Sequence, residues 1–490
     1  MRNKWIYASV IILMLSVVSL AQHRDPAPNR YHQHLQEEGF TPCSDHGDGR
    51  FCTHLPLMSI VTDAPVPAAL LTNEDGTTAP NNEMVSATIT YFDANGNNHL
   101  DDSPSLSSRA MFRTRGASSR NFDKKGYLIK LMKDDLLSNR KLSFSGMAAD
   151  NEWALHGPFI DKTLLRNYLC YNLSGEIMNY APNVRFCELF LNGEYMGVYL
   201  LMEKVTYSSN GRINISRTDP DMVETSYIVQ IDREIDDPLA ELETFGYSSY
   251  LTTTHSSKSG RMQIVYPSKT LTEIQREYIK NDVSAFEKAL FSFDYDNPRR
   301  GYAHYIDVDS FIDYFLINEF TLNYDAVSLS TFLYRDPRSK LKLCVWDFNS
   351  TFNNYEFSNI TPETFKLHTA MWYKQLFKDE NFVANTVDRY WELRETHFNE
   401  DYLFDYIDKT VEYLGPAIER NYEKYGYSFR EEHDFLKPTE RNARSYDEAI
   451  VQLKDVISSR ITHMDEHIDR LYSLSHESLN KRYNYEEGAN

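Results

Sequence analysis

Two aspartates, Asp325 and Asp347, flank a segment of the chain that can fold into a hairpin. The segment covers residues 323–352 and reads NYDAVSLSTFLYRDPRSKLKLCVWDFNSTF. If residues 330–335 pair with residues 340–346 so that opposite numbers sum to about 675, the two carboxylates leave the open end within roughly 10 Å of each other. A divalent cation, or a proton-accepting role for one of them, would relieve their repulsion. The alternative is that each aspartate only caps a turn.

A basic stretch, residues 113–125, has the composition of a phosphate-binding loop. It reads RTRGASSRNFDKK. Small residues would let the backbone approach a triphosphate closely, and cationic side chains would neutralise its charge. The small residues are Gly116, Ser118 and Ser119, and the cations are Arg115, Lys124 and Lys125. The stretch matches neither a Walker A motif nor the usual Gly-rich loop of protein kinases. The alternative is a solvated basic hairpin.

Other metal-binding and catalytic patterns are incomplete. The loop DANGNNHLDD, residues 93–102, alternates oxygen-bearing side chains as an EF-hand does, but its Gly stands at loop position 4 and Pro104 occupies position 12. We expect a long hairpin turn there, with Ca²⁺ binding as the alternative. The 15 His form no HExxH pair, and no GxSxG elbow supports a hydrolase triad.

The composition fits a globular protein that does not attract nucleic acid by its overall charge. Hydrophobic residues make up 41% and charged residues 25% of the 490 positions, and the formal net charge is −20. Such a chain repels a phosphate backbone. Its length favours two or three domains, or one two-lobed domain.

The N-terminus has the pattern of an export signal. Arg2 and Lys4 precede an apolar run, and small residues lie before Gln22. We expect residues 1–21 to be a signal peptide cleaved after Ala21, and the protein to be secreted or held in the periplasm or at the cell surface. An uncleaved anchor is the alternative, although the run is short for a bilayer. No later run is long and apolar enough to cross a membrane, so we expect no transmembrane domain in the mature chain.

Residues 22–55 are polar and are expected to form a loosely ordered lead segment. Within it, Cys43 and Cys52 could close a small disulfide loop in an oxidising compartment, or remain thiols. The other three cysteines lie in apolar runs and are expected to be buried. They are Cys170, Cys187 and Cys344.

The spacing of the apolar residues divides the rest of the chain into a region of strands and a region of helices. Up to residue 204, alternation predicts antiparallel strands, with a helix behind a cap at Asp161 and a hairpin at Asn192-Gly193. Further strands are expected at 226–231 and 262–267, and helices from about residue 270. The pattern is almost wholly helical from about residue 362 to residue 473, and residues 474–490 form a frayed tail.

The order of several blocks resembles the CotH kinases, a family of spore-coat proteins. The blocks are RTRGASSRNFDKKGYLIKL, DKTLLRNYLCYNL, YAPNVRFCELFLNGEYMGVYLLMEK, DVDSFIDYFLINEF and the hairpin segment. The resemblance implies an α+β fold of the atypical, two-lobed protein-kinase-like kind. Residues 56–204 would form an N-lobe built on an antiparallel sheet. Residues 205–473 would form a mostly helical C-lobe that carries the catalytic hairpin 323–352.

The resemblance also implies roles for residues of the hairpin. Asp325 matches the aspartate that orients or deprotonates the acceptor hydroxyl. Asp347 matches the Mg²⁺ ligand, and Asn349 could give a second oxygen ligand where many relatives have Asp. Position 330 is Ser, whereas the kinase pattern has Asn five residues after the base. The chain therefore departs from the two-metal pattern at two positions.

Nucleotide-binding roles follow from the same resemblance. Lys125 is the preferred ATP lysine and Lys130 the second choice. Arg166, on the predicted helix, would hold phosphate or pair with an acid. Glu203 and Lys204, between the lobes, would form the hinge against which adenine packs.

Together these features predict an exported protein kinase. It would transfer the γ-phosphoryl of ATP to Ser or Thr of an extracytoplasmic or surface protein, with Mg²⁺ or Mn²⁺ as cofactor. One alternative is a pseudokinase or surface-binding protein with the same fold, which Ser330 and Asn349 support. Another is a carbohydrate-associated extracellular module, which the aromatic content and the export signal support.

Overall fold

The computed structural model describes most of the chain from residue 50 to residue 478. The described residues are 30, 50–94, 96–207, 212–233, 240–246, 260–354 and 361–478. The predicted signal peptide, most of the polar lead segment and most of the predicted tail lie outside them. Within the described part, the fold is of the α+β class that the sequence predicts.

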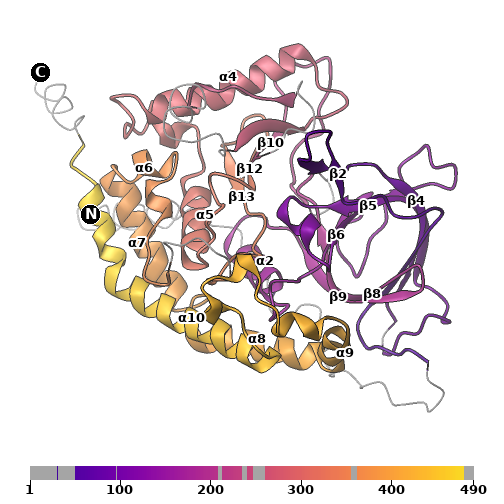
Figure 1. Cartoon of the computed structure of the whole chain (residues 1–490). Helices are drawn as coiled ribbons and strands as arrows, with labels where there is room; N and C mark the ends of the chain where they lie inside the picture. The colour runs from indigo at the N-terminus through magenta and orange to yellow at the C-terminus, as the bar shows by residue number, and fades with distance from the viewer. Residues whose placement is uncertain are drawn as a thin grey trace, which may run out of the picture.

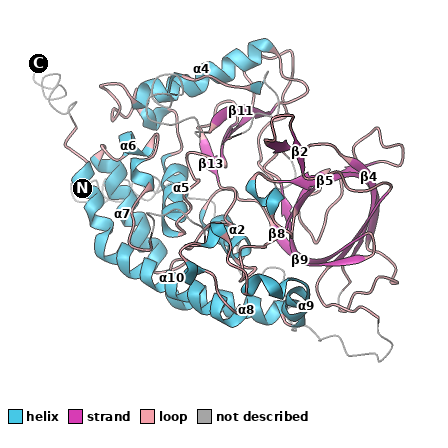
Figure 2. Cartoon of the chain, viewed as in Figure 1, coloured by secondary structure: helices cyan, strands magenta, loops and turns pink. Residues whose placement is uncertain are grey.

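Seven strands of the N-terminal half close into a barrel in the order β1-β4-β5-β6-β7-β9-β8 (Figures 1 and 2). They are β1 Leu57–Thr62, β4 Val85–Phe92, β5 Leu106–Arg115, β6 Gly126–Met132, β7 Glu152–His156, β8 Val184–Leu191 and β9 Glu194–Glu203. Buried and half-buried residues alternate along β4, because successive strand side chains point to opposite faces. A small ribbon of β2 Leu70–Thr72 and β3 Thr78–Pro80 is attached.

The barrel corrects one part of the predicted antiparallel sheet. Strands β1 and β8 pair in parallel, with Leu57 opposite Glu188 and Ile60 opposite Leu191. A parallel pairing needs a long crossover connection rather than a tight turn. The long chain path between β1 and β8 makes this pairing possible. The result is a closed sheet in place of an open antiparallel one.

Two local predictions in this half are confirmed. Asn192 and Gly193 have φ of 51° and 82° and join β8 to β9 as a tight hairpin turn. The predicted helix is α2, Arg166–Ile177. It starts five residues after Asp161, whose carboxylate accepts the backbone N–H groups of Thr163 and Arg166. All the residues of α2 are buried, so the helix has no solvent face.

A second sheet, in the order β11-β10-β12-β13, contains the predicted hairpin. Its strands are β10 Tyr227–Asp232, β11 Arg261–Tyr266, β12 Thr331–Arg335 and β13 Lys342–Cys344. Phe332 pairs with Cys344 and Leu333 with Leu343, within one residue of the predicted register. The paired part is shorter than predicted, because the residues around Asp325 form a turn and those around Asp347 leave the strand.

Helices make up most of the remainder, as predicted, and several of them lie on the side of the second sheet away from the barrel (Figure 1). They are α4 Glu273–Leu290, α5 Val308–Phe320, α6 Tyr373–Leu376, α7 Glu380–Arg394, α8 Glu400–Leu414, α9 Pro416–Tyr425 and α10 Tyr446–His467. Asp307 caps the start of α5, since its side chain accepts the N–H of Ser310. Among the described residues, no helix combines the length and apolar composition needed to cross a membrane.

Two large clusters of buried apolar side chains hold the fold together. One fills the barrel, and the other joins α2, α5, the second sheet and the C-terminal helices. Helix α9 connects the two halves, since it lies against β9. The barrel ends with β9 at Glu203, next to the predicted boundary at residue 204.

The cysteines divide as their sequence contexts suggest. Cys170, Cys187 and Cys344 are free and buried. Cys52 is in a disulfide. Its predicted partner, Cys43, lies outside the described residues.

Candidate active site

Backbone strain concentrates in the hairpin segment. Of the twelve non-glycine residues with positive φ in the described part of the chain, seven lie between residues 322 and 353. They are Leu322, Val327, Ser330, Arg338, Asp347, Phe352 and Asn353. Positive φ is costly for large or β-branched side chains and is concentrated at functional sites. The strain therefore marks the segment that the sequence pattern had singled out.

The turn that carries Asp325 is fixed through its backbone. The carbonyl of Asp325 accepts the N–H of Leu329 at 2.6 Å. The N–H of Val327 donates to the hydroxyl of Thr331 at 2.8 Å, and that hydroxyl is also hydrogen-bonded to Tyr314 of α5 at 2.8 Å. Since these bonds use main-chain groups, they hold the turn without occupying the carboxylate of Asp325.

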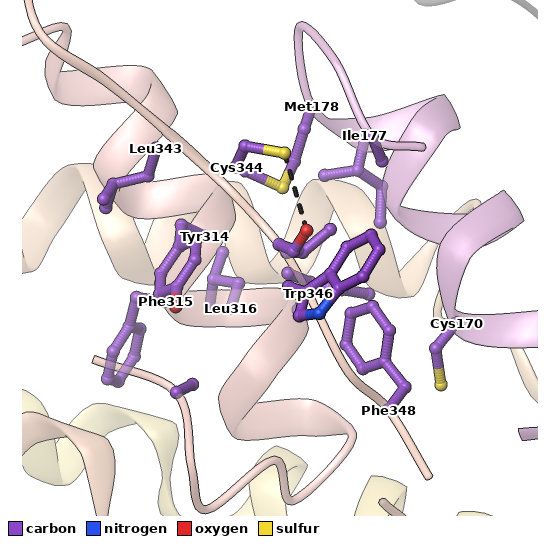
Figure 3. Close-up of a cluster of buried hydrophobic side chains, with 14 of the residues drawn as sticks. Cys170, Ile177, Met178, Tyr314, Phe315, Leu316, Leu343, Cys344, Trp346 and Phe348 are labelled. Atoms are coloured by element: carbon purple, nitrogen blue, oxygen red, sulfur yellow. Dashed lines mark hydrogen bonds between the residues drawn. The ribbon is translucent and has the colours of Figure 1, made fainter. Parts of the chain in front are cut away.

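Helix α2 holds the second aspartate from behind. The N–H of Asp347 donates to the hydroxyl of Tyr171 at 2.9 Å, and the N–H of Phe348 donates to Oδ1 of Asn167 at 3.0 Å. Figure 3 shows Trp346 and Phe348 in the apolar cluster beside α2, on either side of Asp347 in the chain. This packing pins the strained backbone at Asp347, where φ is 61°.

The environment of Asp347 disfavours its charge. Its pKa rises from 3.8 to about 6, first because of burial and then because of the nearby carboxylates of Asp325 and Asp232. The guanidinium of Arg115 and the N–H of Asn349 oppose this rise. A nearby cation would favour the ionised form of this carboxylate.

Asp232, at the end of β10, is a third carboxylate of the site that the sequence analysis missed. Its side chain accepts hydrogen bonds from Nε2 of Gln230 and from the N–H of Arg233, each at 2.7 Å. Burial raises the pKa of Asp232 and of Asp325, and Asp232 raises that of Asp325 further. An acidic residue that ends an apolar strand was the signal available in the sequence.

Cations from three separate parts of the chain face these carboxylates. Arg115, at the end of β5, lies over the ring of Trp346 at 5.5 Å and lowers the pKa of Asp347. A guanidinium nitrogen of Arg233 is 3.9 Å from Asp325, and Arg233 and Lys366 both lower the pKa of Asp325. Among the predicted cations, Arg115 is the one that the structure places beside the aspartates. Neither Arg233 nor Lys366 carried a local sequence signal.

The predicted phosphate loop is a compact turn anchored by Arg120. The turn begins at Gly116, with φ of 106°, and Ser118 and Ser119 open a short 3-10 helix, η1, Ser118–Asn121. Arg120 is buried and donates to the carbonyls of Gly116, Ala69 and Asn81. The loop is therefore held in one shape before any ligand binds.

Lys125 takes part in holding the same loop. Its Nζ donates to the carbonyls of Phe122 at 2.9 Å and Arg120 at 3.3 Å. Lys130, the second choice, lies on β6 opposite Glu152 of β7. Burial alone would raise the pKa of Glu152, but Lys204 and then Lys130 keep it below its ordinary value.

Lys124 and Arg166 are placed in the interior rather than at a phosphate site. Lys124 is fully buried, and its Nζ donates to Oδ1 of Asn421 at 2.6 Å. Arg166 is paired with Asp161 at 2.6 Å, and its Nε donates to the carbonyl of Thr351 at 3.0 Å. Of the two roles predicted for Arg166, the structure shows the pairing with an acid. Both side chains are engaged by internal partners.

Glu203 and Lys204 are likewise engaged with protein groups. Glu203 is fully buried and accepts the backbone N–H groups of Asn183 at 2.9 Å and Ala148 at 3.1 Å. Lys204 pairs with Glu152 at 2.8 Å. These contacts fix the end of β9. The predicted packing of adenine against Glu203 and Lys204 stays a prediction.

The EF-hand-like loop folds as a turn. Asn98 is buried, accepts the N–H of Ala94 at 2.9 Å and donates to the carbonyl of Leu55 at 3.0 Å. In the described ranges, no three His, Cys, Asp or Glu side chains are grouped so that they could hold a metal ion.

Comparison with known proteins identifies the family. Residues 112–464 match the family model of the CotH kinase proteins. This match covers more than half of the chain, and the protein belongs to the CotH family. It is also similar to the inner spore coat protein H of Bacillus subtilis (strain 168), with 24% identity over 325 residues, which cover 63% of this chain and 75% of that protein. Both Asp325 and Asp347 lie inside the matched region.

Proposed function

We propose that the protein is an ATP-dependent phosphotransferase that phosphorylates Ser or Thr of a protein outside the cytoplasm. The observation that carries the proposal is the meeting of Asp325 and Asp347 at one end of the second sheet, with Arg115 and Arg233 facing them. Family membership supports a kinase-like activity. In this proposal the barrel is the nucleotide-binding lobe and the helical half is the catalytic lobe of a kinase-like fold.

The oxygen ligands at the site suit a hard cation. Asp347 supplies a half-buried carboxylate, and Asn349, two residues later, can add an amide oxygen. Mg²⁺ is usually held by one or two protein carboxylates, with the remaining ligands from phosphates and water. The small number of acidic ligands on the protein fits this pattern. Bound there, Mg²⁺ or Mn²⁺ would neutralise the β- and γ-phosphates of ATP.

The protein groups would orient the reactants. Asp325 would accept the hydrogen bond of the acceptor hydroxyl and then its proton, because its carboxylate is partly exposed to solvent. Arg115 would approach the phosphates from the barrel side. Gly116 and the two serines of η1 would bring main-chain groups close to them.

A pseudokinase is the second candidate, and two residues favour it. Ser330 replaces the Asn expected after the base, and Asn349 replaces an acidic metal ligand. Either change weakens the binding of a second cation. In that case the protein would bind nucleotide, or a partner protein, without transferring phosphate.

A transfer assay with binding as a parallel measurement separates the two candidates. The purified protein would be incubated with labelled ATP and Mg²⁺ or Mn²⁺, with itself and a Ser/Thr peptide mixture as acceptors. Asp325→Asn should keep nucleotide affinity but lower transfer by roughly 100-fold or more, the loss expected for a positioned base. Asp388→Asn, on the exposed surface of α7, is the matched control. Binding without transfer in the wild-type protein would favour the pseudokinase.

A further inference from the structure

Lys366 reaches the site from a distant part of the sequence and belongs to none of the motifs described above. It follows β13 by more than twenty residues, and its ammonium group lies 5.2 Å from the ring centre of Tyr324, the residue before Asp325. A cation over an aromatic face is attracted by the ring. Lys366 is an exposed residue, although its ammonium group is partly desolvated.

A buried ion pair holds the backbone of Lys366 in place. The carboxylate of Glu319, on α5, accepts the N–H of Lys366 at 3.1 Å and the N–H of Leu367 at 2.7 Å. Arg460, on α10, pairs with the same carboxylate at 2.9 Å and donates to the carbonyl of Thr364 at 2.7 Å. Glu319 and Arg460 are both almost completely buried. Two helices therefore fix the segment that presents Lys366.

The charge of Lys366 acts on the site. It lowers the pKa of Asp325, whereas partial desolvation lowers the pKa of Lys366 itself, an effect that the carboxylates of Asp325 and Glu319 oppose. Arg115, in contrast, approaches Asp347 from the barrel. The two cations thus act on different aspartates of the same site.

We propose that Lys366 binds the γ-phosphate of ATP and neutralises it during transfer. This inference rests on the proposed function. In the step, the bond between the γ-phosphorus and the bridging oxygen of the β-phosphate breaks, and a bond from the γ-phosphorus to the acceptor oxygen forms. ADP leaves with the electron pair of the broken bond, and the hydroxyl proton passes to Asp325. Fixed cations that face the transferring phosphoryl stabilise the charge that it carries.

The test uses the preference for ATP over ADP, because only ATP has a γ-phosphate. Affinities for both nucleotides with Mg²⁺ would be measured by calorimetry on the wild-type protein, Lys366→Gln, Lys366→Arg and the control Lys374→Gln. Lys374 is an exposed lysine on α6, eight residues away. Lys366→Gln should lose about tenfold or more of the ATP preference and leave ADP affinity unchanged, the effect of one charge-assisted contact. Lys366→Arg should restore part of it.

The transfer rate, measured with the same variants, separates this inference from the proposed function. If the wild-type protein transfers phosphate and Lys366→Gln keeps both the ATP preference and the rate, the role of Lys366 is refuted alone. If the wild-type protein prefers ATP but transfers nothing, the proposed function fails, while loss of the preference in Lys366→Gln would still support the contact. An equal loss of ATP and ADP affinity in Lys366→Gln would also overturn the proposed contact with the γ-phosphate. So would a wild-type protein that binds neither nucleotide. Lys366→Met, which keeps the apolar stem on Tyr324, replaces Lys366→Gln if the latter fails to fold.

Discussion

Replacing Asp347 by Asn should stabilise the nucleotide-free protein and abolish its response to Mg²⁺ and ATP. The reason is that the folded protein keeps a carboxylate where its charge is disfavoured, with a pKa of about 6. Asn removes the charge while keeping the size of the side chain. It also tolerates the φ of 61° at this position, whereas Ala would add backbone strain.

The size of the effect follows from the pKa. As the pH rises above 3.8, an unfolded chain ionises Asp347, while the folded protein retains the proton until about pH 6. The folded state therefore loses stability between these values, and above pH 6 the loss reaches about 3 kcal/mol. Asn should recover up to this amount at pH 7.5 and almost nothing at pH 4. For a chain of this size, the gain corresponds to a rise in Tm of roughly 3 °C.

Thermal unfolding at pH 4 and pH 7.5, with and without Mg²⁺ and ATP, tests the reasoning. Wild-type protein should be stabilised by Mg²⁺ with ATP at pH 7.5, and Asp347→Asn should not. Asp388→Asn, on the surface of α7, should behave as wild type in each condition. Two results would refute the conclusion that the folded protein disfavours the charge of Asp347. Asp347→Asn could be less stable than wild type at pH 7.5, or it could be stabilised equally at both pH values. Retained stabilisation by Mg²⁺ with ATP would remove Asp347 from the cation site.

Three further substitutions and one chemical measurement test the placement of other residues. Lys124→Met should leave the stabilisation by ATP intact and the free energy of unfolding unchanged or higher, because burial holds the pKa of this lysine well below its ordinary value. Loss of the stabilisation by ATP would show that Lys124 contributes to nucleotide binding. Arg166→Ala should lower the free energy of unfolding in urea by about 3–5 kcal/mol, since it leaves Asp161 buried and unpaired, and an effect below 1 kcal/mol would contradict that pairing. Gly116→Ala should cost about 1 kcal/mol or more by denaturant unfolding and weaken ATP binding, because its φ of 106° is unfavourable for Ala; unchanged ATP affinity would separate the loop from the nucleotide. Mass spectrometry of the unreduced protein should show Cys52 linked to Cys43, and a free thiol at Cys43 would exclude that pairing.

Local patterns predicted several elements because neighbouring residues alone decide them. The turn at Asn192-Gly193 needs two residues that accept positive φ, and the sequence supplies them. The hairpin around Asp325 and Asp347 was also predictable, since two apolar runs and a Pro-containing turn allow few registers. The start of α2 was placed too early, because the carboxylate of Asp161 holds a separate turn before the helix.

Lys124 and Lys125 show where sequence reasoning reached its limit. The two residues are adjacent and chemically identical, yet Lys124 lies in the interior against Asn421, whereas Lys125 closes the loop through main-chain carbonyls. Their difference arises from packing against α9, which is almost three hundred residues away in the sequence. No local pattern contains that information.

The sequence by itself determined the α+β class, the family, and the two aspartates of the candidate site, because motif spacing and strand alternation are local properties. The tertiary structure decided how the barrel closes, which basic residues lie near the aspartates, and which are used in the interior. It brought Asp232 and Arg233, which are adjacent at the end of β10, and Lys366, from a distant segment, to Asp325. The physical reason is that charge interactions and burial depend on distance in space, and only the packing of the barrel, α5 and α10 sets those distances.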